Sequence, residues 1–167
     1  GNRSGKFDGE TYCEVPSDVV PFEQRPWMKA AEIADAMIDA LRSGKYRTLR
    51  CNFANGDMVG HTGSFRAATM SIEAVDLELA RILPVIDEMG GVALITADHG
   101  NVEEMFDEET GQPNTQHSTL PVPFIFCSSR KGTISPGGSL ADVAPTMLAL
   151  MGLQQTEDMT GRNLITL

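Results

Sequence analysis

The spacing of apolar residues along the chain predicts three helices. Between residues 27 and 42, apolar side chains recur at helical intervals, and a Ser-Gly pair ends the run. The strongest pattern covers residues 72–89, where apolar positions step by three and four before Gly90-Gly91. A last helix is predicted for residues 140–151. The stepping positions of the strongest pattern are Ile72, Val75, Leu79, Ile82, Ile86 and Met89.

Short apolar runs predict strands between these helices. Residues 46–53 form a short and mixed run that is a plausible strand. Residues 92–97 are continuously apolar, which suits a strand buried on both faces, and residues 122–127 are a further apolar strand. Residues 1–25 are rich in glycine, proline and charge, which predicts an irregular leading segment. The acidic and polar residues 107–117 predict a loop.

The order strand, helix, strand, strand, helix predicts an α/β fold with a largely parallel sheet flanked by helices. In open sheets of this kind, ligands gather beyond the carboxyl ends of the strands. Asp57 follows the first predicted strand and Asp98 follows the second. His117 precedes the third strand, so a loop must bring it back to the same edge. The turn-rich stretch 55–63, with three glycines, is predicted to be a loop.

The charge and composition of the chain exclude some classes of binding partner. The net charge is −10, and no basic patch is available to neutralise phosphates, which excludes nucleic acid and anionic membrane surfaces. No apolar run approaches the roughly 18 residues that a membrane span needs. An acidic chain that acts on a phosphate ester would need added positive charge, and a bound divalent metal supplies it. Three cysteines without a pairing pattern argue against disulfides and favour a reducing compartment.

All three histidines lie near carboxylates or glycine-rich turns. Asp57 and His61 are four residues apart, a spacing that puts both side chains on one face of a helical turn. Asp98 and His99 directly follow the second predicted strand, and His117 lies in a Gln-His-Ser-Thr stretch. Carboxylate and imidazole together suit manganese or zinc. Five such side chains are too many for one tetrahedral ion and indicate two ions, an arrangement that clamps a transferring phosphoryl group.

Other polar residues near these motifs have two interpretations. Asn52, Asn55 and Arg66 are candidates for orienting ligands or substrate, and a structural role is equally compatible with the sequence. The acidic residues 103–109 are interpreted as a solvated loop and not as a metal site.

Several long motifs match one family. They are NFANGDMVGHTG at residues 52–63, ITADHGN at 95–101, HSTLPVP at 117–123, MTGRNL at 159–164, and FDGE at 7–10. With these motifs the chain resembles the C-terminal part of the phosphatase domain of cofactor-independent, that is 2,3-bisphosphoglycerate-independent, phosphoglycerate mutases. That family lies within the alkaline phosphatase superfamily. The resemblance extends over the whole chain.

The resemblance implies an isomerase of glycolysis and gluconeogenesis that interconverts 2- and 3-phosphoglycerate through a phosphoserine intermediate. It implies two divalent ions, Mn²⁺ first and Zn²⁺ or Co²⁺ as alternatives, with no nucleotide and no 2,3-bisphosphoglycerate as cofactor. Asp57, His61 and His117 would hold one ion, and Asp98 and His99 would help to hold the other. We expect a cytoplasmic enzyme that acts as a monomer on a small-molecule phosphoglycerate.

The chain departs from the family pattern at its most reactive residue. The family's nucleophilic serine, a further metal-binding aspartate and the inserted substrate domain have no counterpart here. Ser64, Ser71 and Ser118 lie near the motifs, but none matches the nucleophile motif. We therefore expect residues 1–167 to be the C-terminal portion of the metal-binding phosphatase domain. That portion would be inactive alone and completed by an N-terminal segment of the same polypeptide.

Two other functions stay open on the sequence. A phosphopentomutase or another phosphohydrolase of the alkaline phosphatase superfamily would share the Asp-x-x-x-His and Asp-His pairs, because two-metal chemistry requires them. A non-catalytic metal-binding module would be complete as it stands. Exchange between phosphoglycerate isomers distinguishes a mutase from a hydrolase, which releases phosphate. An upstream in-frame segment would exclude the module.

Overall fold

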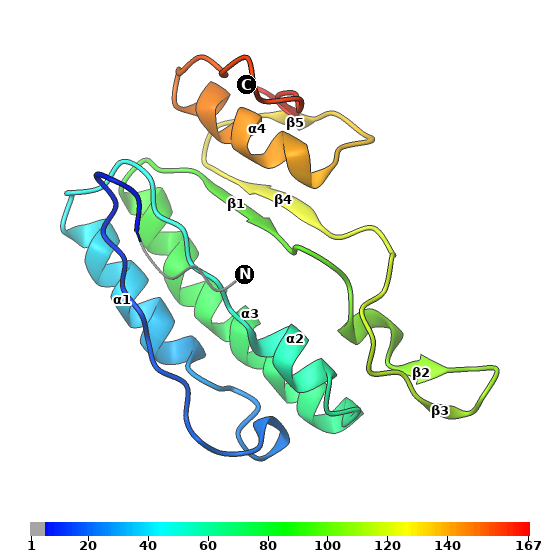
Figure 1. Ribbon diagram of the computed structural model, residues 1–167. Coiled ribbons are helices and arrows are strands. Elements are labelled where there is room, and N and C mark those ends of the chain that lie inside the picture. The colour runs from blue at the N-terminus through cyan, green and yellow to red at the C-terminus, as the bar shows by residue number, and fades with distance from the viewer. Residues whose placement is uncertain (1–5) are drawn as a thin grey trace. The chain divides into compact units, whose positions relative to one another are not determined.

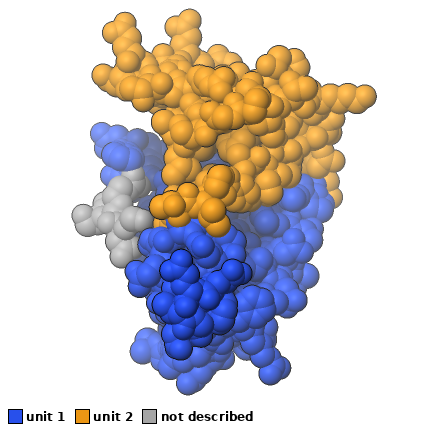
Figure 2. Space-filling view, turned by 90° about the vertical axis from the view of Figure 1, so that its right-hand side faces the viewer, with its two compact units in different colours: residues 1–85, 101–118 blue, residues 86–100, 119–167 orange. Residues whose placement is uncertain are grey.

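The computed structural model describes residues 6–167; the first five residues of the predicted irregular segment lie outside the described part. The chain forms two compact units. Unit 1 comprises Gly1–Val85 and Asn101–Ser118, and unit 2 comprises Ile86–Gly100 and Thr119–Leu167. Figure 2 shows them in blue and orange.

Unit 1 is built mainly from helices (Figure 1). Its elements are η1 (Phe22–Gln24), α1 (Ala30–Arg42), α2 (Asn55–Gly60), most of α3 (Phe65–Glu88), η2 (Val102–Glu104), β2 (Phe106–Asp107) and β3 (Gln112–Pro113). Both predicted helices of this region are confirmed. α1 begins after a turn in which Met28 has a positive φ of 46°. α3 ends where predicted, because Gly90 adopts a φ of 66° and its N–H bonds to the carbonyl of Asp87 at 2.9 Å.

Three predictions for unit 1 were wrong. Residues 46–53 form no strand, because no neighbouring strand pairs with them in the described part of the chain. Within the predicted loop 55–63, residues 55–60 form the helix α2, since the local bonds of a helical turn tolerate the glycines. The predicted loop 107–117 contains a strand of the antiparallel pair β2–β3.

The core of unit 1 lies between α2 and the first turns of α3. Its buried residues are Val59, Ala67, Ala68 and Met105, with Phe22, Met28 and Val102 packed against them. Val59 of α2 is fully buried in this cluster, so packing helps to fix the helix that carries Asp57 and His61.

Unit 2 contains four short strands and a helix near its C-terminal end (Figure 1). Its elements are β1 (Ala93–Thr96), β4 (Phe124–Cys127), β5 (Thr133–Ile134), η3 (Leu140–Asp142), α4 (Val143–Leu150) and β6 (Ile165–Thr166). The strands predicted at 92–97 and 122–127 are confirmed. The helix predicted at 140–151 is also present, with its first turn in the tighter 3₁₀ form.

The predicted parallel direction of the strands was wrong for the described pairs. β1 and β4 pair antiparallel, with Ala93 opposite Cys127 and Thr96 opposite Phe124. The reason lies in their connection, which contains only η2 and the hairpin β2–β3 and no crossover helix. β1 is half-buried and Thr96 is exposed, so β1 is not buried on both faces as predicted.

Two negative expectations concern the whole described chain. No helix among residues 6–167 is long and apolar enough to cross a membrane. The three cysteines, Cys13, Cys51 and Cys127, are free thiols, in agreement with the expected absence of disulfides.

Candidate metal centre

Helix α2 presents Asp57 and His61 on one face. His61 caps the helix, and its backbone N–H bonds to the Asp57 carbonyl at 3.1 Å, so one helical turn separates the two side chains. The helix is anchored by Asn55, which is buried and whose Nδ2 donates to the carbonyls of Pro26 and Trp27 at 3.2 and 3.0 Å. Of the two roles considered for Asn55, orienting a ligand or stabilising the fold, these hydrogen bonds support the structural one.

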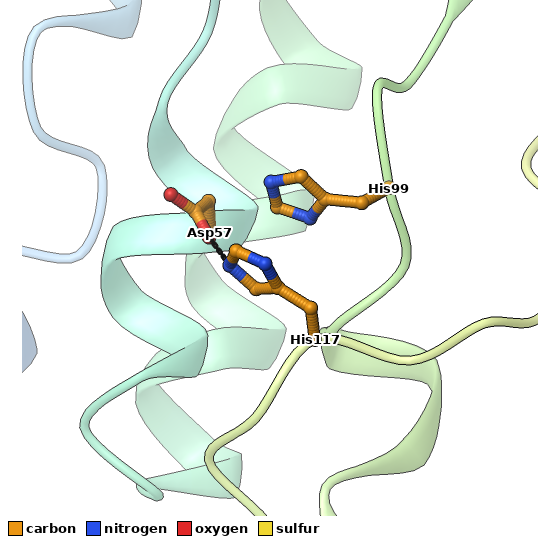
Figure 3. Close-up of side chains that lie close together, drawn as sticks. All are labelled: Asp57, His99 and His117. Atoms are coloured by element: carbon orange, nitrogen blue, oxygen red, sulfur yellow. Dashed lines mark hydrogen bonds and ion pairs between the residues drawn. The ribbon is translucent and has the colours of Figure 1, made fainter. Parts of the chain in front are cut away.

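The loop after β3 brings His117 to this helix. His117 Nε2 lies 2.9 Å from Asp57 Oδ1, the contact drawn as a dashed line in Figure 3. His61 Nε2 lies 3.0 Å from the same carboxylate oxygen. The two imidazole nitrogens are 3.1 Å apart. Three potential ligand atoms, separated by 60 residues of sequence, therefore converge on one point within unit 1.

A backbone carbonyl sets the tautomer of His61. Thr115 O lies 2.7 Å from His61 Nδ1, and a carbonyl can only accept, so Nδ1 carries the hydrogen. In the neutral ring, Nε2 then directs its lone pair at the Asp57 carboxylate and at His117 Nε2. Either the hydrogen on His117 Nε2 or a metal ion bound by all three side chains can lie between these atoms. A His ligand whose other ring N–H bonds a backbone carbonyl is a recurring feature of metal sites.

The chemistry of the donor set fits a divalent transition metal. One carboxylate and two imidazoles are the mixed oxygen and nitrogen ligands that Mn²⁺, Zn²⁺ and Co²⁺ accept. The side chains of Asp57, His61 and His117 are 36, 41 and 47% exposed, so they are accessible to an ion from solvent. Three side chains leave coordination positions for further ligands or for a substrate oxygen.

The other two predicted ligands belong to unit 2. Asp98 and His99 follow β1 directly, at its carboxyl end, as the sequence predicts. Asp98 Oδ1 lies 3.7 Å from His99 Nε2, and His99 Nδ1 lies 3.3 Å from the carbonyl of Gly100. Asp98 is 79% exposed and His99 is 28% exposed. His99, also labelled in Figure 3, thus has one ring nitrogen at a carbonyl and the other at a carboxylate.

Sequence reasoning missed three residues around the centre. Thr115 acts through its carbonyl oxygen, and a side-chain pattern gives no signal for that. Glu103, which the sequence assigned to a solvated loop, accepts hydrogen bonds from the Asn101 N–H at 2.8 Å and from the Ser118 hydroxyl. The available signal was the position of Ser118, immediately after a candidate ligand.

Comparison with known proteins shows the family to which this chain belongs. The model of the Metalloenzyme superfamily matches residues 1–155, and the chain belongs to that superfamily. It is 60% identical over 168 aligned residues to the 2,3-bisphosphoglycerate-independent phosphoglycerate mutase of Cellvibrio japonicus. It is 49% identical to the enzyme of the same name from Pseudomonas aeruginosa. Each alignment covers 100% of this chain and 33% of the relative, so the chain spans about a third of the length of these curated relatives.

A solved structure gives the same result for the fold. A crystal structure of Leishmania mexicana phosphoglycerate mutase at low cobalt concentration matches with a TM-score of 0.90 and 40% sequence identity. The match covers 100% of this chain and 34% of that one. The resemblance stated from the motifs is confirmed, and so is the α/β class as part of an alkaline-phosphatase-like domain.

Proposed function

We propose that the protein containing this chain is a divalent-metal-dependent, cofactor-independent phosphoglycerate mutase. The observation that carries the proposal is the convergence of Asp57, His61 and His117, whose ligand atoms lie 2.9 to 3.1 Å apart. The similarity of the whole chain to about a third of the length of proteins of that name supports the substrate, a small phosphoglycerate.

In this proposal Asp57, His61 and His117 hold one ion, and Asp98 and His99 help to hold a second. Mn²⁺ is the proposed metal, with Zn²⁺ and Co²⁺ as alternatives that the same ligands accept. The bound ions would supply positive charge that stabilises an alkoxide and the developing charge on the phosphoryl oxygens. The chain's own contribution is to fix the ligands. α2 sets Asp57 and His61, and the carbonyl of Thr115 fixes the ring of His61.

The phosphoryl group would pass from the substrate to a serine hydroxyl and then to the other hydroxyl of the glycerate. That serine, a further aspartate ligand and the substrate domain would belong to the rest of the polypeptide. Residues 1–167 would therefore form the C-terminal portion of the phosphatase domain and have no mutase activity alone. The complete protein would act as a cytoplasmic monomer in glycolysis and gluconeogenesis.

Metal titration tests the proposed site. The metal-free full-length protein, titrated calorimetrically with Mn²⁺, is expected to bind saturably, and His61→Ala is expected to lose one binding event. Gln116→Ala is the matched control, because it truncates the exposed neighbour of His117 and leaves the three proposed ligands in place. Equal Mn²⁺ binding by the wild type and His61→Ala would contradict the ligand set.

Enzyme assays test the activity separately. The full-length protein with Mn²⁺ is expected to exchange 3-phosphoglycerate with 2-phosphoglycerate without net phosphate release. The 167-residue chain is expected to show no exchange. Net phosphate release would instead support a phosphohydrolase, and metal binding without either reaction would support a non-catalytic module.

A further inference from the structure

His117 lies in a segment that has no helix or strand of its own. After β3, residues 114–121 belong to no helix or strand, and Ser118 makes a single isolated bridge pairing, so no regular element holds the ring in place. The other two proposed ligands of this centre sit on α2, where intrahelical bonds hold them. Some other contact must therefore set His117 against Asp57 and His61.

Glu103 makes such a contact on the residue next to His117. Its Oε1 accepts a hydrogen bond from the hydroxyl of Ser118. Its Oε2 accepts from the backbone N–H of Asn101 at 2.8 Å, which closes the turn η2 on itself. One carboxylate thus joins η2 to the segment that carries His117, entirely within unit 1.

The residue that caps the start of η2, Asn101, packs against the last residue of α2. Asn101 is 5% exposed, and its side chain lies so close to Gly60 that a Cβ there would be 2.1 Å from Asn101 Oδ1. Only glycine at position 60 allows this approach. Gly60 immediately precedes His61, so one end of the 101–103 segment contacts the neighbour of His61 and the other end contacts Ser118, the neighbour of His117.

We propose that Glu103 is a positioning residue, which holds His117 in register with Asp57 and His61 by linking Ser118 to the turn seated on α2. The inference rests on the metal site proposed above. Outer partners of metal ligands change metal affinity by about 10- to 100-fold when they are removed. Removal of Glu103 would change the metal affinity by a similar factor, although Glu103 does not contact the ion.

Four variants of the full-length protein test the link, with Mn²⁺ titration as the first measurement. Glu103→Ala and Ser118→Ala are expected to weaken Mn²⁺ binding by about 10- to 100-fold. Glu103→Gln is expected to restore near-normal binding, because its oxygen accepts from the Asn101 N–H and its amide N–H donates to the Ser118 hydroxyl. Glu104→Ala removes the same charge from the neighbouring exposed position of η2 and is expected to bind like the wild type.

A second measurement does not depend on any metal. In the metal-free protein, the NMR signals of the His117 ring are expected to shift or broaden in Glu103→Ala and Ser118→Ala, while those of His61 remain. The double variant is expected to show no larger change than either single one, since both break one link.

Two results overturn the proposal in distinguishable ways. If His61→Ala abolishes Mn²⁺ binding but Glu103→Ala binds like Glu104→Ala, the metal site stands and the positioning role fails. If His61→Ala has no effect, the metal site itself fails. In that case an unchanged His117 ring in metal-free Glu103→Ala also overturns the positioning role.

Discussion

The carbonyl oxygen of Thr115 lies 2.7 Å from Nδ1 of His61 and places the ring hydrogen on that nitrogen. The opposite nitrogen, Nε2, is thereby left to face Asp57 and His117. A main-chain carbonyl from a loop thus orients the ring of the proposed ligand His61. The same loop carries His117 two residues further on.

This relationship predicts the tautomer of His61. In the full-length protein loaded with diamagnetic Zn²⁺, ¹⁵N-resolved NMR is expected to show a hydrogen on Nδ1 of His61 and none on Nε2. The Nδ1 hydrogen should exchange slowly with water, because it is bonded to Thr115 O. A spectrum with the hydrogen on Nε2 would contradict the assignment of His61 as a ligand through that atom.

The Asp142 carboxylate predicts how unit 2 responds to acid. Backbone N–H groups of Arg162 and Ser139 donate to its two oxygens, each at 2.7 Å, and these bonds lower the pKa of Asp142. A lowered folded-state pKa contributes stability above the unfolded value of about 3.9, and that contribution is lost as pH falls through the folded value. Asp142→Asn is expected to lower the melting temperature at pH 7, because its NH₂ faces an N–H donor. Between about pH 5 and 2 the melting temperature of Asp142→Asn should fall less steeply than that of the wild type, because the variant has no carboxylate to protonate at this position.

Melting curves measured across this pH range check the effect. Asp158→Asn is the control, because it removes one carboxylate from an exposed turn of the same unit. Parallel pH profiles for the wild type and Asp142→Asn would show that the backbone bonds do not favour the charged carboxylate.

Glu78 is a buried carboxyl group on α3, and we predict that loss of its partner Arg81 destabilises the protein. Glu78 is 6% exposed and contacts the Arg81 guanidinium at 2.5 Å, and Arg81 also pairs with the exposed Asp35. Arg81→Met is expected to lower the free energy of unfolding, because the buried Glu78 carboxyl group loses this hydrogen-bond partner. Adding Glu78→Leu should recover most of the loss, since no unpaired charge then remains.

Chemical denaturation measures these differences, and Asp35→Asn separates the two pairs. Loss of the exposed Asp35 partner is expected to cost at most about 0.5 kcal/mol. If Asp35→Asn costs as much as Arg81→Met, burial of Glu78 is not the source of the effect.

Gly161 predicts a site in unit 2 that tolerates no side chain. A Cβ there would lie 2.1 Å from the carbonyl oxygen of Ala141 and 2.9 Å from the N of Asp142. Backbone atoms cannot rotate away, so Gly161→Ala must displace η3, the turn that leads into α4. The expected cost is about 1–3 kcal/mol of unfolding free energy, as for other overpacked sites. Thr160→Ala, at the exposed neighbouring position, should unfold like the wild type in the same denaturant series.

The sequence predicted those features that depend on neighbours along the chain. α1, α3, β1 and β4 were found from apolar spacing and flanking turns, because helix periodicity and short apolar runs are local properties. The pairing of Asp57 with His61 was also local, since four residues make one helical turn. The direction of the strand pairs was not local. It depends on the route of the chain between β1 and β4, which the pattern of either strand does not contain.

The sequence by itself therefore determined the helices, the two main strands, and the residue types that can bind a metal. Only the tertiary structure decided that His117 meets Asp57 across 60 residues, that the Thr115 carbonyl contacts His61, and that Glu103 bonds to Ser118 beside His117. The physical reason is that these contacts use a backbone carbonyl and side chains from irregular segments. Their geometry is fixed by packing against α2, and no periodic pattern in the sequence records that packing.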